Sequence, residues 1–208
     1  VSFLRDHPQL VSKKIFLFLG RVHPKKGPDL LLNAIAILQK EGYWDPTEMT
    51  LVLAGPNDNP YASQLVRLAE KLNISESIYW TGMITGDQKW GVFQAAEAFV
   101  LPSHQENFGI SVVEALSCGI PVLISASVNI APEIEKDGAG LIDQDNVDGT
   151  ARLFRRWFSL NLKEKAEMRR KASLSFKQRF HISKTSRSIT KNIYLALLER
   201  AMLQKVTK

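Results

Sequence analysis

The residues of this chain best placed for chemistry lie between an apolar run that ends at Leu101 and an apolar helical pattern that begins at Ile110. The run from Ala98 has the length of a buried strand, and the proline after it cannot continue a hydrogen-bonded ladder. The polar stretch 103–109 is therefore expected to connect the carboxyl end of a strand to the amino end of a helix, where open α/β sheets bind ligands. Free N–H groups in the first turn of that helix favour an anion.

Two carboxylates bracket this predicted anion site. Glu106 lies in the polar stretch and Glu114 inside the helix, with seven residues between them, and Gly109 allows a close backbone approach. A carboxylate does not help to bind a phosphate, so both glutamates are expected to face hydroxyl groups, such as those of a ribose and a sugar ring. The alternative for Glu114 is a partly buried helix glutamate paired with a cation.

A second polar stretch, residues 20–28, follows the apolar run Ile15–Leu19 and carries Arg21, Lys25 and Lys26. These cations would lie at the carboxyl end of another strand. A nucleoside diphosphate brings about two negative charges that fixed cations or a metal must offset. The stretch therefore suits a diphosphate, although by itself it is also compatible with a solvated basic turn.

The residues around both stretches resemble the retaining GT-B glycosyltransferases of family 4. The resemblance rests on the E-x7-E spacing in its strand–loop–helix–strand context and on a G-R-x(n)-K-G signature. The matching residues are Pro102–Ser103, Glu106–Gly109, Glu114–Val122, Gly20, Arg21, Lys26 and Gly27. The chain is thus identified, on resemblance, as the C-terminal, donor-binding half of such an enzyme.

The resemblance implies roles for individual residues. Arg21 and Lys26 would hold the donor diphosphate and offset charge on the leaving nucleotide, and Glu106 would lie near the donor sugar, so these three are the catalytic candidates. Glu114 would bind the ribose hydroxyls, whereas the resemblance carries no role over to Lys25. The remaining nucleotide-sugar-binding candidates act largely through the backbone, and they are Gly20, Ile84, Asn107, Phe108, Gly109, Ile110 and Ser111.

The resemblance also implies a reaction and partners. The intact enzyme would transfer a hexosyl group, with retention, from a UDP-, GDP- or ADP-sugar to a sugar or lipid-linked acceptor, with no metal and no other cofactor. Its partners would be the nucleotide sugar and an N-terminal, acceptor-binding domain of the same polypeptide. This chain alone would then bind the donor and transfer little or nothing.

Six strand-like segments alternate with helical patterns up to about residue 150, which predicts an α/β fold with a Rossmann-like, doubly wound parallel sheet. Beyond that point the pattern is helical and forms a C-terminal tail. We expect a linker over residues 1–14, the nucleotide-sugar-binding domain over 15–180, and a helix over 181–208 whose apolar stripe packs on the N-terminal domain.

Composition narrows the class of protein. No apolar run in the 208 residues reaches the roughly 18 of a membrane span. The single cysteine, Cys118, excludes an internal disulfide and fits a reducing compartment, so we expect a cytoplasmic protein. From Arg152 onward the sequence contains 16 Lys and Arg but only three Glu. This tail is compatible with solvated helix faces or with peripheral contact to an anionic membrane, and no nucleic-acid partner is expected.

Two further sequence features could suggest a metal site. Asp143 and Asp145 spell a D-x-D sequence, which we expect to be a turn and helix cap rather than a metal site, and the four histidines show no metal-ligand spacing. A non-catalytic nucleotide or sugar sensor stays open, and it would be distinguished by whether the full gene encodes an N-terminal Rossmann-like domain. A related GT-B epimerase or phosphorylase also stays open. The Arg21/Lys26 and Glu106/Glu114 combination argues against an epimerase, and no lysine is evidently placed for pyridoxal phosphate.

Overall fold

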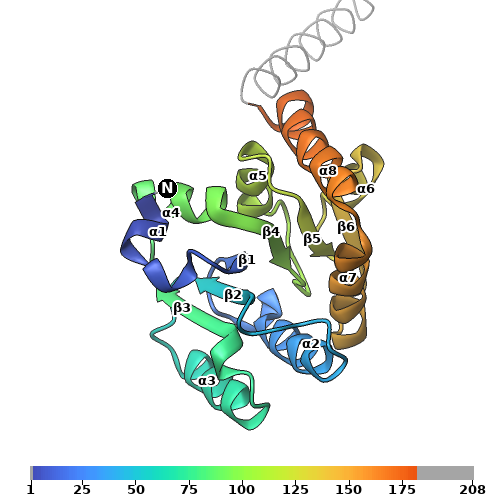
Figure 1. Ribbon diagram of the computed structural model, residues 1–208. Helices are drawn as coiled ribbons and strands as arrows, with labels where there is room; N and C mark the ends of the chain where they lie inside the picture. Colours follow the sequence, from blue (N-terminus) through green and yellow to red (C-terminus); the bar gives the residue numbers. More distant parts are fainter. Residues whose placement is uncertain (1, 182–208) are drawn as a thin grey trace, which may run out of the picture.

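Six apolar runs form a parallel sheet in the computed structural model, which describes residues 2–181 (Figure 1). The spatial order of the strands is β3-β2-β1-β4-β5-β6, and every neighbouring pair is parallel. The strands are β1 (Lys14–Leu19), β2 (Met49–Ala54), β3 (Ile78–Gly82), β4 (Ala96–Leu101), β5 (Val122–Ser125) and β6 (Gly140–Asp143). The α/β, Rossmann-like sheet predicted from the sequence is confirmed.

The strand order reverses between β1 and β4. The chain builds outward from β1 through β2 to β3, then returns so that β4 lies on the other side of β1. The loops that follow β1 and β4 therefore leave the sheet side by side at its carboxyl edge, where such folds hold their ligands. Both polar stretches singled out in the sequence are these two loops.

Helices cover both faces of the sheet. Figure 1 shows α2 and α3 on one side and α1, α4 and α5 on the other, and α2 also packs against α7. The described chain ends in a short π-helical turn, Phe176–Phe180, after the predicted helical tail has formed α7 and α8. The helices are α1 (Ser2–Asp6), α2 (Pro28–Lys40), α3 (Pro60–Lys71), α4 (Gly86–Ala95), α5 (Ile110–Ser117), α6 (Ala131–Asp137), α7 (Val147–Ser159) and α8 (Leu162–Ser175).

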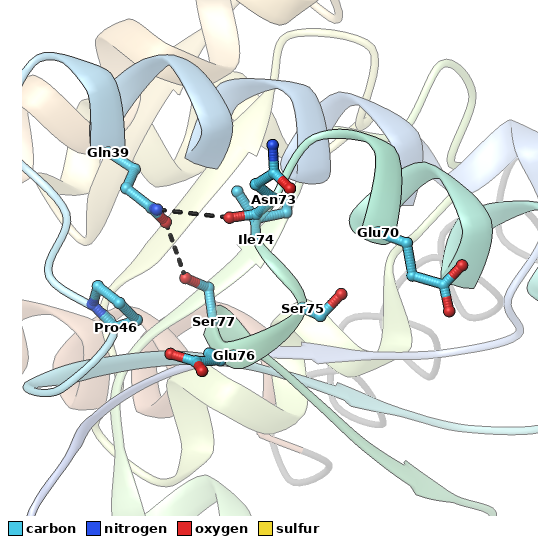
Figure 2. Close-up of a pocket in the computed structure, with 8 residues that line it drawn as sticks. All are labelled: Gln39, Pro46, Glu70, Asn73, Ile74, Ser75, Glu76 and Ser77. Carbon is cyan, nitrogen blue, oxygen red and sulfur yellow. Dashed lines mark hydrogen bonds between the residues drawn. The ribbon is translucent and has the colours of Figure 1, made fainter.

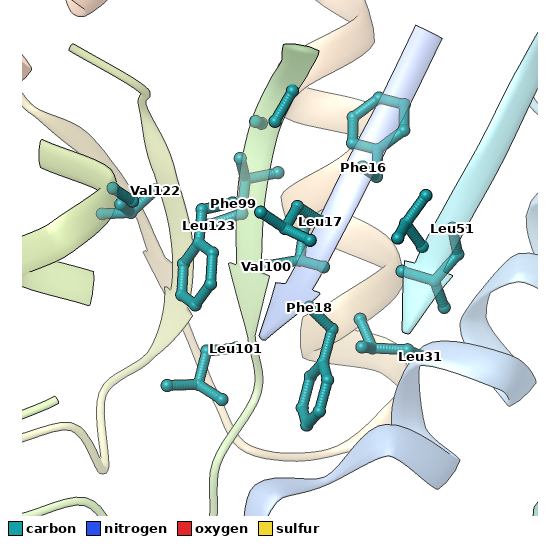
Figure 3. Packing of buried hydrophobic residues seen from close by; sticks show 14 of the residues in the cluster. Phe16, Leu17, Phe18, Leu31, Leu51, Phe99, Val100, Leu101, Val122 and Leu123 are labelled. Atoms are coloured by element: carbon teal, nitrogen blue, oxygen red, sulfur yellow. The ribbon is translucent and has the colours of Figure 1, made fainter. Parts of the chain in front are cut away.

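The core lies along the two central strands (Figure 3). Residues 15–18 of β1 and 98–101 of β4 are each no more than 1% exposed. A parallel strand covered by helices on both faces has no solvent-facing side, so its sequence is a continuous apolar run. The ring of Phe16 adds an aromatic cluster with Trp44 and Phe154, at centroid distances of 5.3 and 5.2 Å.

Residues 2–14 belong to the packed structure rather than forming the linker that we expected over residues 1–14. Residues 2–6 form α1, which packs against α4, and both Phe3 and Leu10 are buried in the core. Too little apolar periodicity precedes β1 for the sequence alone to show this burial. Of the C-terminal helix expected over 181–208, all but the first residue lies outside the described residues.

Replacing Phe3 with alanine should lower the free energy of unfolding by about 3 kcal/mol, because it removes a fully buried ring and leaves a cavity. Urea denaturation followed by circular dichroism measures the change. Val11→Ala is the control in the same segment, because Val11 is 63% exposed and its truncation should change stability by less than about 0.5 kcal/mol. Equal, small effects of both substitutions would show that the segment is a linker after all.

Candidate functional site

The loops after β1 and β4 are hydrogen-bonded to each other. The carbonyl of Lys25 accepts bonds from the His104 N–H at 2.9 Å and from the Ser103 hydroxyl at 2.8 Å. Gly27 has φ +67°, and a Cβ atom added to it would lie 2.3 Å from the carbonyl oxygen of Pro102. Only glycine fits at this approach, so the two polar stretches form one rigid unit at the crevice.

A hollow of about 230 Å³ lies between these loops and is rich in cationic groups. Its lining is Arg21, His23, Lys25, Lys26, Gln105, Glu106 and Asn107. The Lys26 ammonium group is paired with the Glu106 carboxylate, while the side chains of Arg21 and Lys25 make no ion pair with any described residue. Burial, and after it the positive charge of Arg21, lowers the pKa of Lys26 below its ordinary value. A bound polyanion would relieve the repulsion between these cations.

Glu106 is held in place by its backbone as well as by Lys26. Its N–H donates to the carbonyl of Ser127 at 3.2 Å, and its own carbonyl accepts from the N–H of Asn129 at 2.9 Å. Its carboxylate also accepts from the N–H of Gly109 at 3.3 Å. One of the amide groups predicted to meet the donor is therefore occupied by Glu106 here, and the groups of Ile110 and Ser111 follow at the start of α5.

A second hollow, of about 500 Å³ and mainly apolar, adjoins the first at the carboxyl ends of β1, β2 and β3. Arg21 lines both hollows, so the two hollows share a cationic residue. The predicted residues Gly20 and Ile84 are both in this lining. The full lining is Leu19, Gly20, Arg21, Gly55, Pro56, Met83, Ile84, Thr85, Gly86, Lys89 and Trp90. An apolar hollow beside a cationic one suits a flat ring that carries a charged group.

Glu114 lies on α5 and is half-buried. It pairs with a cation, as one of the two interpretations drawn from the sequence predicts. The Lys89 Nζ, from α4, is 2.5 Å from Glu114 Oε1. Lys89 also lines the apolar hollow, so the pair places the Glu114 carboxylate beside it. The pair with Lys89 uses Oε1, and the second oxygen of a carboxylate also accepts hydrogen bonds.

Residues 3–175 match the family model described as "Glycosyl transferases group 1". The chain belongs to this family. Among curated relatives it is 36% identical over 140 residues to the D-inositol 3-phosphate glycosyltransferase of Mycolicibacterium smegmatis, covering 65% of this chain and 30% of that protein. It is 32% identical over 140 residues to the D-inositol 3-phosphate glycosyltransferase of Salinispora arenicola, with the same coverage. The chain thus spans about a third of these relatives.

Solved structures share the fold of this group 1 glycosyltransferase domain at low sequence identity. Sucrose-phosphate synthase from Thermosynechococcus elongatus matches with a TM-score of 0.79 and 21% identity, over 96% of this chain and 49% of that one. Anabaena HepE in complex with UDP matches with a TM-score of 0.80 and 20% identity, over 93% of this chain and 52% of that one. The GT-B relationship expected from the sequence is confirmed.

The structure brings the other predicted site residues of the glycosyltransferase domain to the same edge. Asn107 lines the cationic hollow, while Phe108 and Ile110 are 48% and 68% exposed beside it. Sequence reasoning did not assign several lining residues, among them His23, Gln105, Pro56, Lys89 and Trp90. His23 and Gln105 lie within the two predicted loops and were only overlooked; Pro56, Lys89 and Trp90 had no signal in their spacing.

The D-x-D sequence is not the turn and helix cap that we expected, because Asp143 is the last residue of β6, Asp145 lies in a bend, and neither aspartate caps the following helix. Asp143 pairs with Arg152 at 2.6 Å, and Asp145 lies 3.0 Å from the ring Nδ1 of His104, which lowers the pKa of the Asp145 carboxyl. The side chain of Asn146 caps α7 instead. Among residues 2–181 no group of three or more His, Cys, Asp or Glu is arranged to hold a metal ion, and no helix is long and apolar enough to span a membrane.

A further hollow, of about 380 Å³, lies at the opposite edge of the sheet (Figure 2). Its lining precedes β2 and β3, so it opens at the amino ends of strands. Gln39 there donates to the carbonyl of Asn73 at 3.5 Å and accepts from the hydroxyl of Ser77 at 3.3 Å. Its charged lining residues are Glu70 and Glu76, with no Lys or Arg. It is therefore unsuited to a diphosphate and separate from the crevice.

Proposed function

We propose that this chain is the nucleotide-sugar donor-binding domain of a retaining glycosyltransferase that uses no metal. The intact enzyme transfers a hexosyl group from a nucleoside-diphosphate sugar to a sugar or lipid-linked acceptor in the cytoplasm. The observation that carries the proposal is the pair of adjoining hollows, one apolar and one cationic, with Arg21 in the lining of both. Group 1 membership and the solved HepE complex with UDP support a nucleotide ligand for this geometry.

In this proposal the base of the donor occupies the apolar hollow, near the backbone of Ile84. The diphosphate lies in the cationic hollow, against Arg21 and Lys26 and toward the amino end of α5. The ribose lies between the two, within reach of Glu114, and the transferred sugar lies near Glu106. Each part of the donor thereby meets a surface of matching polarity.

The chemistry asked of these residues is electrostatic. The bond from the anomeric carbon to the diphosphate breaks, and its electron pair leaves on the phosphate oxygen. Arg21 and Lys26 offset that charge in a partly buried hollow, where fixed cations stabilise it without reorganising. The acceptor oxygen forms the new bond to the anomeric carbon, and its proton passes to the oxygen of the departing diphosphate. The rigid contact between the two loops holds the donor in one pose.

Calorimetric titration with UDP, GDP and ADP tests the donor site. One nucleotide should bind in preference to the others, and both Arg21→Ala and Glu114→Ala should weaken it by roughly tenfold or more, since each removes a charged contact. Arg67→Ala is the control, because Arg67 is an exposed arginine on α3 and lines neither hollow. No binding at millimolar concentration, or equal losses in all three variants, would contradict the proposal.

Transfer by the 208-residue chain itself is expected to be negligible. The chain spans 30% of its curated relatives, and in this proposal the acceptor site belongs to the part of the enzyme outside that span. To measure transfer, the chain is incubated with the preferred nucleotide sugar and candidate acceptors, and the nucleoside diphosphate that is released is quantified. Robust transfer by the purified chain would show that donor and acceptor sites both lie within it.

A further inference from the structure

Lys89 contacts both the apolar hollow and Glu114, and the sequence analysis assigned it no role. Its side chain reaches from α4 to α5, where Nζ lies 2.5 Å from Glu114 Oε1. The two side chains are only 26% and 20% exposed. The same lysine lines the apolar hollow, whereas Glu114 is in the lining of neither hollow. Lys89 therefore connects the lining of the apolar hollow to the Glu114 carboxylate.

The pairing uses one oxygen of the carboxylate. Lys89 contacts Oε1, and no residue in the described part of the chain donates a hydrogen bond to Oε2. An ammonium group at this distance fixes the orientation of a half-buried carboxylate more firmly than water does. The orientation of Oε2 is then fixed, and this oxygen can accept a hydrogen bond from a ligand.

The lysine also changes the charge that a phosphate would meet. An unpaired Glu114 would add a negative charge on the same edge as the cationic hollow, and this charge would oppose an anionic ligand. Paired with Lys89, the site is locally neutral at Glu114 and cationic at Arg21. The pair thus permits a carboxylate to serve hydroxyl groups close to a diphosphate.

We propose that Lys89 is a positioning residue that makes donor binding depend on the ribose hydroxyl groups, by holding the Glu114 carboxylate with Oε2 free to accept from them. This inference rests on the proposed donor site. It assigns a specificity role to a residue of α4: a nucleotide that carries the 2′-hydroxyl is preferred over its 2′-deoxy counterpart because Glu114 is held ready for that group. Removing a charge-assisted hydrogen bond to the hydroxyl should cost about tenfold in affinity.

The experiment compares affinities for UDP, GDP and ADP with those for their 2′-deoxy forms, using the pair that binds wild type most tightly. The variants are Lys89→Met, which keeps the side-chain length without the charge, and Lys89→Arg, which keeps the charge. Lys165→Met is the matched control. Lys165 is 19% exposed, pairs with Glu97 at 3.3 Å, and lies 4.8 Å from a tryptophan ring, much as Lys89 lies 5.1 Å from that of Trp90.

We expect wild type, Lys89→Arg and Lys165→Met to prefer the ribonucleotide by about tenfold, and Lys89→Met to lose most of that preference. The thermal unfolding temperatures of Lys89→Met and Lys165→Met should change by similar amounts. A loss of preference in Lys89→Met alone would then come from the position of Glu114 and not from lower stability. A preference kept or increased in Lys89→Met would overturn the inference, since the lysine would then be structural or would block Glu114.

Different results would contradict the proposed donor site and the proposed role of Lys89. If wild type binds ribonucleotide and deoxynucleotide equally, the donor site stands and the role of Lys89 is overturned. If wild type binds none of the nucleotides, the proposed function is overturned, and the inference that rests on it falls too. If Lys165→Met loses the preference as Lys89→Met does, the effect comes from breaking any half-buried ion pair, and the inference is again overturned.

Discussion

Lys26→Met should weaken nucleoside diphosphate binding by roughly 100-fold, from two effects of the same change. The variant loses a cation of the hollow that lies against the diphosphate. It also leaves the Glu106 carboxylate without the ammonium group that pairs with it, so a negative charge then faces the phosphates. Isothermal titration calorimetry with the preferred nucleoside diphosphate measures the change.

The neighbouring lysine supplies the control. Lys25 is exposed in the same loop and lines the same hollow but has no ion-pair partner among the described residues, so Lys25→Met should cost only a few-fold. The double variant Lys26→Met/Glu106→Gln should recover about tenfold relative to Lys26→Met, because the unpaired carboxylate is gone. Equal losses at Lys25 and Lys26, with no recovery, would show that the loop acts only through its total charge.

Gly55→Ala should lower the free energy of unfolding by at least about 3 kcal/mol, the second large effect that the structure implies. Gly55 follows β2 with φ +143°, and an added Cβ atom would lie 1.9 Å from the carbonyl oxygen of Gly20. Its N–H also donates to the carbonyl of Gly82 at 2.9 Å. The ends of β1, β2 and β3 meet here, directly at the apolar hollow. The added Cβ atom would meet backbone atoms of Gly20, so no flexible side chain can move to relieve the clash.

Gly42→Ala is the control for the conformational part of that effect. Gly42 has φ +77°, but an added Cβ atom would meet no heavy atom within 4 Å. Its substitution should therefore cost only the roughly 1 kcal/mol of placing a side chain in the left-handed region. Guanidinium denaturation of both variants gives the comparison, and similar losses would mean that the contact with Gly20 is unimportant.

The sequence by itself determined the six strands and the location of the candidate site. The strands were recognisable because parallel strands buried on both faces are continuous apolar runs, as in Ile15–Leu19. The loop residues around Glu106 and Arg21 were recognisable because turn formers, cations and carboxylates follow those runs directly. These are local properties of the chain, and they need no knowledge of which strands are neighbours.

Only the tertiary structure decided which of these residues meet. Lys26 and Glu106 are 80 residues apart and pair because β4 returns to lie beside β1. Arg21 joins two hollows, and Lys89 reaches Glu114, through the packing of loops and helices around that crevice. Likewise, Phe3 is buried because α1 packs on α4. Such contacts depend on strand order and on helix packing, which the local pattern of apolar and polar residues does not encode.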